Sequence, residues 1–273
     1  MSIAKLIDTV WDYYRVNKRG DLPWRPAPDA NDEIDPYAVL VSELMLQQTQ
    51  VSRVVPKFTA WMQTYPTMQD LASASLKDVL QLWDGLGYTR RAKYLHDIAR
   101  QLAGKPFPRT VAELTALKGI GENTAGAILT YSYNQSHIFI ETNVRTVLLH
   151  HMHQDADDVD DKALHKTMQQ VLDALDDGEY REFYWAIMDY GTHLKQSGVR
   201  NIARSKHYVK QSVFAGSKRQ LRGKVMRIIA HAEGPVYRTE ISQKLVDDRL
   251  DAVLADLAAD GLVQLVDDQV VIT

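Results

Sequence analysis

Two glutamates of the sequence lie in surroundings that favour opposite charge states. Glu43 sits in "VLVSELML", where apolar neighbours on both sides would desolvate its carboxyl group and favour the protonated form that a general acid needs. Glu141 follows the apolar run "IFI" at a predicted helix start, where the helix N-terminus favours an ionised carboxylate. Two carboxyl groups tuned apart in this way can divide proton donation and charge stabilisation between them. Taken alone, the two residues also fit a plainer interpretation: a charge at a helix edge and an ordinary helix start.

A Gly-x-Gly turn in "LKGIGENTAGAIL" (117–129) is the second feature that could do chemistry. Gly119 and Gly121 let the backbone approach a ligand closely, and the helix that follows begins near Asn123 and Thr124, so its first amides can bind a phosphate. The stretch lacks the Lys-Ser/Thr of a nucleotide P-loop and the third glycine of a dinucleotide fold. Such a turn would hold a nucleic-acid backbone without reading bases. A plain helix C-cap is the alternative.

The composition excludes several kinds of site. The 273 residues include no cysteine, which rules out disulfides, thiolate metal sites, iron–sulfur clusters and cysteine nucleophiles. The apolar runs are short and broken by charge, so we expect no membrane segment. The motif "HHMHQDADD" (150–158) fits a helix end running into an acidic loop better than a metal site, and we predict no metal.

The net charge of -3 conceals an uneven distribution along the chain. From Lys195 to Lys224 there is no acidic residue, whereas acidic residues prevail from Thr239 to the end. Solvated surfaces normally mix both signs, so this basic segment predicts a surface that faces a polyanion, with a basic linker as the alternative. Its nine basic residues are Lys195, Arg200, Arg204, Lys206, Lys210, Lys218, Arg219, Arg222 and Lys224.

Helical periodicity prevails up to Gly191, and this part is predicted to be all-α. Asp35 and Pro36 form a good helix start, and that helix is expected to continue through "YAVLVSELMLQQTQVSRVV" to Pro56. The other predicted helices are Ser2–Lys18, Val55–Thr64, Ser75–Leu82, Thr89–Leu102, Thr110–Leu117, Thr124–Tyr133, Asn143–His151, Lys162–Leu175 and Tyr180–Gly191.

The tail of the chain changes character. Three helices are predicted, over Ser217–Ala232, Thr239–Val246 and Arg249–Asp260, and "LVQLVDDQVVIT" then predicts two short strands. This order is typical of a winged-helix module, whose third helix reads a DNA groove in DNA-binding versions. Here that helix carries Asp251, Asp256 and Asp260, which phosphates would repel. We therefore expect a structural or protein-facing role for it.

Five motifs in a fixed order carry a family resemblance. They are "LPWR" (22–25), "SELMLQQTQV" (42–51), "GLGYTRRAKYL" (85–95), "LKGIGENTAGAIL" (117–129) and "IETNVRTVL" (140–148). Over roughly residues 1–215 the chain resembles the helix-hairpin-helix DNA glycosylases, and most closely their MutY (adenine DNA glycosylase) branch. The resemblance implies a mainly α fold of two helical subdomains, which hold DNA while a base is flipped out of the stack. The expected domains are residues 1–215, the glycosylase domain, and residues 216–273, the winged-helix-like module.

The resemblance assigns the chemistry to three residues. Glu43 would protonate the leaving base and handle the water, and Asn143 matches the family's asparagine near the sugar. Glu141 stands where the family has aspartate, and the extra methylene moves the carboxylate by about 1.5 Å. The site could therefore be repacked and active, suited to another substrate, or weakened. Glycosylases that also nick the strand place a Schiff-base lysine at the position of Asn123, so we expect a monofunctional enzyme.

The resemblance also implies DNA contacts. Gln47 and Gln48 match the residues that enter the stack beside the lesion, and Tyr88 matches an aromatic wedge. Arg25 matches a residue that lines the base pocket. Ordinary surface or core positions are the alternatives for these four residues.

Members of the family generally follow "MDYG"-like sequence (188–191) with four cysteines that hold an iron–sulfur cluster, which this chain cannot form. We expect hydrophobic packing around Tyr208, Val209, Val213 and Phe214 to replace that anchor. Arg204, Lys206 and Lys210 would meet the DNA backbone. A monovalent cation held by hairpin carbonyls, as in relatives, is compatible with the resemblance, and no other cofactor is expected.

Several functions follow from these features. The first is a monofunctional DNA glycosylase of base excision repair, removing adenine mispaired with 8-oxoguanine or guanine. The alternatives are a thymine/uracil mismatch glycosylase, a non-catalytic DNA-damage binding protein in which Glu141 marks a lost active site, and an all-α structural repeat protein. The expected partner is double-stranded DNA with a mispair or damaged base, bound by a monomer. In the absence of a signal pattern at the N-terminus, we expect a cytoplasmic, nucleoid-associated location.

Overall fold

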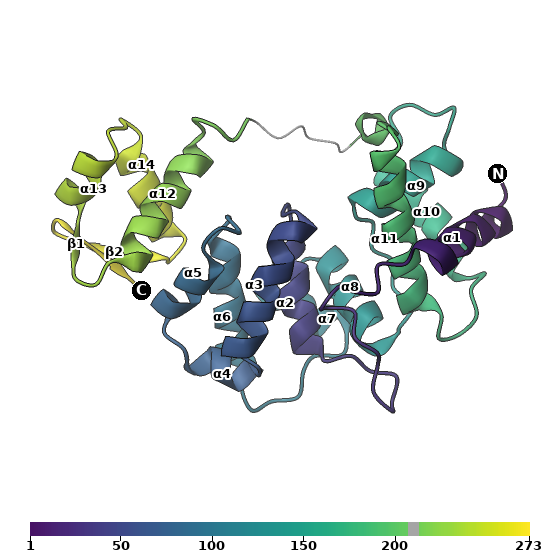
Figure 1. Ribbon diagram of the computed structural model, residues 1–273, viewed down its shortest axis with the longest axis horizontal. Helices are drawn as coiled ribbons and strands as arrows, with labels where there is room; N and C mark the ends of the chain where they lie inside the picture. Colours follow the sequence, from purple (N-terminus) through teal and green to yellow (C-terminus); the bar gives the residue numbers. More distant parts are fainter. Residues whose placement is uncertain (207–212) are drawn as a thin grey trace. The chain divides into compact units, whose positions relative to one another are not determined.

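The computed structural model describes residues 1–206 and 213–273 and is predominantly helical, with one small sheet near the C-terminus (Figure 1). The predicted mainly α fold with a C-terminal α+β module is confirmed. Lys210 and the expected anchor residues Tyr208 and Val209 lie outside the described residues. Among the helices of the described ranges, none combines the length and the apolar character that crossing a bilayer requires.

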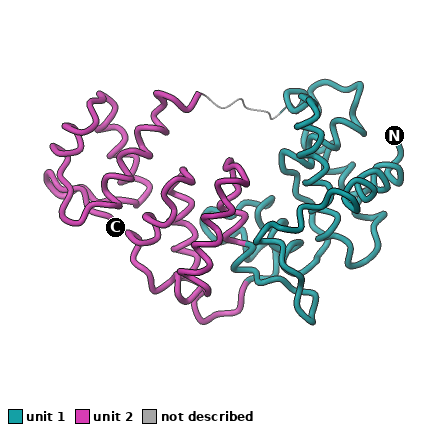
Figure 2. The backbone as a smooth tube through the Cα atoms, in the orientation of Figure 1, with its two compact units in different colours: residues 1–39, 108–210 teal, residues 40–107, 211–273 magenta. Residues whose placement is uncertain are grey.

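The chain divides into two compact units, each assembled from two stretches of sequence (Figure 2). Unit 1 comprises Met1–Val39 and Pro108–Lys210, and unit 2 comprises Leu40–Phe107 and Gln211–Thr273. This division groups the C-terminal module with residues 40–107, and the domain boundary expected at residue 215 stays a prediction.

Unit 1 is built around the long helix α11. Its helices are α1 (Ile3–Asn17), α7 (Val111–Thr115), α8 (Glu122–Tyr133), α9 (Thr142–His151), α10 (Asp161–Leu172), α11 (Tyr180–Gln196) and the 3-10 turn η1 (Ile202–Arg204). Both α1 and α9 pack against α11. The rings of Phe139 and Tyr184 stack with centroids 3.8 Å apart at the centre of this core. Burying such large rings supplies most of the driving force for packing.

The predicted helix-hairpin-helix is formed by α7 and α8. Thr110 caps α7 in a capping box with Glu113. Gly119 has φ 97°, a left-handed conformation that favours glycine, and Gly121 is the N-cap of α8. Helix α8 begins at Glu122, two residues before the predicted start, so Asn123 and Thr124 both lie in its first turn.

Unit 2 corrects one predicted helix and adds another. Its helices before the C-terminal module are most of α2 (Pro36–Leu46), α3 (Val51–Thr64), α4 (Met68–Ser73), α5 (Leu76–Trp83) and α6 (Arg90–Leu102). The helix expected to continue to Pro56 ends at Leu46 instead, and Pro56 lies inside α3. The short helix α4 was missed, although Thr67 and Asp70 form a capping box that the sequence displays.

The C-terminal module has the predicted winged-helix order. It consists of α12 (Lys218–His231), β1 (Val236–Tyr237), α13 (Arg238–Lys244), α14 (Leu250–Ala259), β2 (Val263–Val266) and β3 (Gln269–Ile272). The antiparallel sheet has the order β1-β3-β2, with Val236 opposite Val270 and Val263 opposite Ile272. The predicted hairpin is present, and β1 is a third strand that was not predicted.

Within unit 2, helix α12 packs against α5. The Arg227 guanidinium donates to both carboxylate oxygens of Asp84 at 2.8 and 3.0 Å. The Gln81 amide donates to the Ala230 carbonyl at 2.7 Å. These contacts join the module to the helices of residues 40–107.

Candidate functional site

In unit 1, the segment that leads into Glu141 is held from two sides. The Tyr184 hydroxyl accepts the Phe139 N–H at 3.1 Å and donates to the His137 carbonyl at 2.9 Å. The Asn123 side-chain oxygen accepts the Ile140 N–H at 3.3 Å. Asn123, on the hairpin, thus fixes the backbone beside Glu141.

Glu141 is the N-cap residue of α9, yet within the described residues its side chain makes no hydrogen bond to the first turn of that helix. The carboxyl group therefore does not act as an ordinary helix cap. Burial raises the pKa of Glu141. This is opposite to the effect expected from the helix N-terminus, because desolvation dominates at this position.

Asn143 lies two residues further on, in the first turn of α9. Its amide nitrogen donates to the Thr192 hydroxyl at 3.3 Å. Its side-chain oxygen is buried and finds no hydrogen-bond partner among the described residues. Buried acceptors are almost always paired, so this atom marks a place where a bound group can donate. Gly191 makes the close packing possible, because a Cβ there would lie 2.5 Å from the Asn143 carbonyl oxygen.

Arg25 contacts α11 at Asp189, one helical turn away from Thr192. It donates to both carboxylate oxygens of Asp189 at 3.0 Å, and Arg19 donates to the same carboxylate from its side chain at 2.7 Å. Burial would raise the pKa of Asp189, but the hydrogen bonds and charges of the two arginines outweigh it, and the pKa is lowered. The Arg25 guanidinium also lies over the Trp185 ring, 5.5 Å from its centroid.

A cavity of about 410 Å³ in unit 1 adjoins this pair. It is lined by aromatic and charged side chains, among them Tyr14, Arg19, Arg25, Asp32, Arg181 and Trp185. Its size falls within the range of small-molecule pockets. The structure thus places Arg25, the predicted base-pocket residue, in the wall of a cavity.

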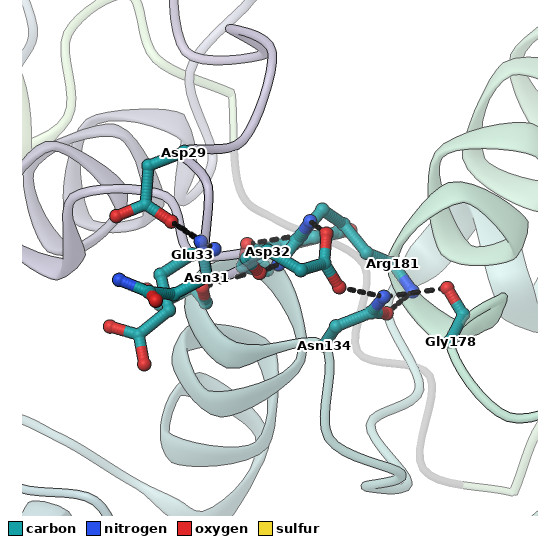
Figure 3. A network of polar contacts seen from close by, with 9 residues as sticks. Asp29, Asn31, Asp32, Glu33, Asn134, Gly178 and Arg181 are labelled. Atoms are coloured by element: carbon teal, nitrogen blue, oxygen red, sulfur yellow. Dashed lines mark hydrogen bonds and ion pairs between the residues drawn. The ribbon is translucent and has the colours of Figure 1, made fainter.

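One side of the cavity is fixed by the polar network in Figure 3. Arg181 donates to the carboxylate of Asp32 at 2.8 Å and to its carbonyl at 2.6 Å. The Asn134 amide donates to Asp32 at 2.7 Å and to the Gly178 carbonyl at 2.5 Å. The network ties the loop around Asp32 to the start of α11, so this wall is pre-formed.

In unit 2, Glu43 lies on α2 and is 9% exposed, so it is not a charge at a solvated helix edge. Gln47 and Gln48 are exposed in the turn after α2, where Gln48 has φ 55°. Tyr88 is 40% exposed with φ 48°, whereas the aromatic ring of Trp83, at the end of α5, is fully buried. The turn residues and Tyr88 are therefore surface features, as their predicted DNA contacts require.

Arg91 joins the two loops that carry these residues, and it was not among the predicted site residues. Its guanidinium donates to the carbonyls of Leu44 and Gln47 at the end of α2, and to those of Leu86 and Gly87 before α6. Burial lowers the pKa of Arg91 to about 10. These donations satisfy carbonyls at the C-terminal end of α2, next to the turn in which Gln48 has φ 55°. The signal that the sequence offered for Arg91 was its place directly after the motif "GLGYTR".

The basic segment is largely engaged in contacts within the protein. Arg204 donates to the carbonyls of His153 and Ala156, and Lys206 pairs through its backbone with Val159. In the C-terminal module Lys218 pairs with Asp256 at 2.7 Å, and Arg222 pairs with Asp260. Asp251 of α14 pairs with Arg238 of α13 at 2.7 Å, so basic residues of two helices offset the acidic ones. The predicted phosphate contacts of Arg204 and Lys206 stay predictions.

The residues after α11 do not fit an iron–sulfur cluster, because the chain has no cysteine to supply thiolates. Polar contacts hold this segment instead. The Asn201 amide donates to the Thr146 carbonyl at 2.9 Å, and Arg145 donates to the Ser205 hydroxyl at 2.9 Å. The expected hydrophobic anchor is wrong for Val213 and Phe214, which are exposed in unit 2.

No group of three or more metal-ligating side chains occurs in residues 1–206 and 213–273. The histidine motif is engaged otherwise: the His153 ring nitrogen lies 3.0 Å from the Thr167 hydroxyl. The absence of a metal stays a prediction.

Comparison with known proteins places these elements in a family. Residues 41–173 match the HhH-GPD superfamily of base excision DNA repair proteins. The adenine DNA glycosylase of Mycolicibacterium smegmatis is 34% identical over 267 residues, covering 90% of this chain and 88% of that protein. The human adenine DNA glycosylase is 38% identical over 224 residues, covering 75% of this chain and 40% of that longer protein. The solved structure of a thermostable thymine-DNA glycosylase matches the fold with a TM-score of 0.57 at 20% identity, covering 69% of this chain and 85% of its own.

The chain therefore belongs to the HhH-GPD superfamily of base excision DNA repair proteins, as its motifs predicted. Within that superfamily it is MutY-like, and it is a DNA N-glycosylase.

Proposed function

We propose that this glycosylase excises adenine mispaired with 8-oxoguanine or guanine from double-stranded DNA, as a monomer and without cutting the strand. The relatives named adenine DNA glycosylase support the choice of base. The observation that carries the catalytic part is the start of α9. There Glu141 is not used as a helix cap, and Asn143 keeps a buried oxygen without a partner among the described residues.

The chemistry divides between the two glutamates. Glu43, buried on α2, donates a proton to a ring nitrogen of adenine as the bond between that base and C1′ breaks. The Glu141 carboxylate stabilises the oxocarbenium charge that develops on the sugar. Water then adds to C1′ and gives its proton to the Glu43 carboxylate, which restores the acid. The products are free adenine and an abasic site.

Asn123 supports hydrolysis without a lyase step. A strand-nicking enzyme needs an amine to form a Schiff base with the sugar, and an amide nitrogen is not a nucleophile. Here the Asn123 side chain instead accepts a hydrogen bond from Ile140. We propose that its role is to hold the Glu141 segment in place.

Arg25 is the proposed residue of the pocket that receives the flipped base, as the resemblance implies. Its two hydrogen bonds to the Asp189 carboxylate hold the guanidinium in a fixed position. The backbone amides at the start of α8 are proposed to bind a phosphate of the DNA backbone. Such a contact does not depend on the DNA sequence.

A panel of duplexes tests this function. Purified protein is incubated with duplexes carrying adenine opposite 8-oxoguanine, adenine opposite guanine, thymine opposite guanine and uracil opposite guanine, and abasic sites are then cleaved with alkali. We expect scission of the two adenine duplexes only, and none before alkali is added. Scission of the thymine or uracil duplex instead would assign the mismatch activity. Tight binding without any scission would identify a non-catalytic damage binder.

A further inference from the structure

The exposed aromatic ring of Tyr88 is held by a residue of the C-terminal module. The Arg219 guanidinium, in the first turn of α12, donates to the Tyr88 hydroxyl at 2.7 Å. It also lies over the Tyr88 ring, 5.9 Å from the centroid. A charged donor on a phenol is among the stronger hydrogen bonds, so this contact restricts where the ring can point.

A second guanidinium approaches the same ring from within residues 40–107. The Arg91 guanidinium lies over the Tyr88 ring at 5.1 Å, and Arg91 is itself fixed by the carbonyls of two loops. The Tyr88 ring is therefore contacted by the fixed Arg91 guanidinium, and its hydroxyl is bound by Arg219. Its backbone has φ 48°, which is uncommon for a large side chain and requires support from its surroundings.

The position of Arg219 is set by the rest of α12. The bidentate Arg227–Asp84 pair and the Gln81 hydrogen bond to Ala230 fix the C-terminal half of this helix on α5. The neighbouring basic residues Lys218 and Arg222 point to the acidic helix α14, where they pair with Asp256 and Asp260. Arg219 is the basic residue of this turn that reaches Tyr88.

We propose that Arg219 is a positioning residue for Tyr88, so that the C-terminal module supports DNA binding indirectly, by holding this ring from the first turn of α12. The proposal rests on the proposed function and on the predicted role of Tyr88 as an aromatic wedge in DNA. The acidic residues that phosphates repel lie on α14 and at its end, and they pair with basic residues of α12 and α13. The exposed Phe214 ring lies 5.8 Å from the Arg219 guanidinium and extends the same surface.

A double-mutant cycle tests the proposal. The variants are Tyr88→Phe, Arg219→Gln and the two together, with Arg227→Gln as a matched arginine change on the same helix. The measured quantity is the Kd for a duplex carrying a tetrahydrofuran abasic analogue opposite 8-oxoguanine, taken at several salt concentrations. We expect each single variant to weaken binding by about three- to tenfold and the double variant to lose no more than either one, because all three remove the same hydrogen bond.

The salt dependence and the control separate positioning from other roles. Arg219→Gln should leave the slope of log Kd against log salt unchanged, whereas losing a phosphate contact would lower it by about one unit. Arg227→Gln should change Kd by less than about twofold, because this ion pair is largely exposed and the Gln81 hydrogen bond and the packing of α12 against α5 still hold the helix when it is lost. Losses that multiply in the double variant, a lowered salt slope, an unaltered Arg219→Gln or an equal loss in Arg227→Gln would each overturn the proposal.

This experiment also distinguishes the positioning role from the proposed function. The cycle measures binding only, so it reports on Arg219 whatever base is excised. Excision of adenine by the wild type with no coupling between Arg219 and Tyr88 would leave the proposed function standing and remove the positioning role. Coupling between Arg219 and Tyr88 in binding, without excision of adenine by the wild type, would support the positioning role and contradict the proposed function.

Discussion

At the scale of single residues, the length of the Glu141 side chain is the main departure from the family pattern. Its side chain is one methylene longer than the family's aspartate, and misplacing a catalytic group by about 1 Å can cost on the order of a hundredfold in rate. Yet the segment before it is held by Tyr184 and Asn123, and Ile140 and Val144 beside it are buried. Apolar neighbours of this kind can adjust their packing around the longer acid.

We predict that Glu141→Gln lowers the single-turnover excision rate by about a hundred- to a thousandfold, because a single electrostatic stabiliser is worth about 3–4 kcal/mol. Glu141→Asp is expected to lower the rate as well, since the shorter carboxylate would stand about one bond too far from the sugar. A faster Glu141→Asp would mean that the wild-type pocket is a poor copy of the family's. Full activity in Glu141→Gln would remove this residue from the mechanism.

The pH dependence follows from the direction of the Glu141 shift. Burial raises the pKa of this carboxyl above its ordinary value of 4.5, and the proposed role needs the ionised form. The protonated, inactive form therefore persists to a higher pH than for an exposed glutamate, and the rate should rise as pH increases through that raised pKa. The glutamine of Glu141→Gln cannot ionise. The single-turnover excision rate that remains in this variant, measured over the same pH range, should therefore not show this rise.

At the scale of elements, much of the fold follows from local patterns, and the exceptions follow from tertiary contacts. Capping residues and periodicity predicted the hairpin, the helix starts at Ser2 and Ser217, and the order of elements in the C-terminal module. The break after α2 could not be predicted from local patterns, because the carbonyls at this end of the helix are bound by Arg91, which is distant in the sequence. The short strand β1 has only two residues and exists only through its pairing with β3.

The close approach of α11 to α9 gives the clearest prediction at this scale. An added Cβ at Gly191 would lie 2.5 Å from the Asn143 carbonyl oxygen and 2.9 Å from its Cβ, so the start of α9 would have to move. We expect Gly191→Ala to destabilise the protein by about 1–3 kcal/mol and to lower excision at least tenfold.

Gly223→Ala is the matched control for this change. Gly223 is also a helical glycine, but a Cβ there meets nothing within 4 Å. Alanine should raise helix stability slightly at that position. Thermal melting and single-turnover excision on both variants decide the outcome. Normal stability and rate in Gly191→Ala would show that α9 can shift without harm to the site.

At the scale of the whole molecule, the sequence predicted the class of protein better than it predicted which groups the basic residues contact. The five motifs placed the chain in its superfamily, and the structure puts the motif residues on helices and loops of two units. The basic segment was expected to face DNA as a whole. Arg204 instead donates to carbonyls of its own unit, and Lys218 and Arg222 pair with Asp256 and Asp260. Charge counts along a sequence cannot reveal such pairings, because the partners lie on other elements.

The proton donated by Glu43 is the central claim of the proposed mechanism, and one measurement tests it most directly. Single-turnover excision of adenine opposite 8-oxoguanine is compared for wild type, Glu43→Gln and the matched control Glu240→Gln, whose glutamate is exposed on α13. Glutamine keeps the shape of the buried side chain but cannot deliver a proton, so we expect a loss of at least about a hundredfold with DNA affinity nearly unchanged. The control should retain the wild-type rate. Excision by Glu43→Gln within tenfold of wild type would contradict the account.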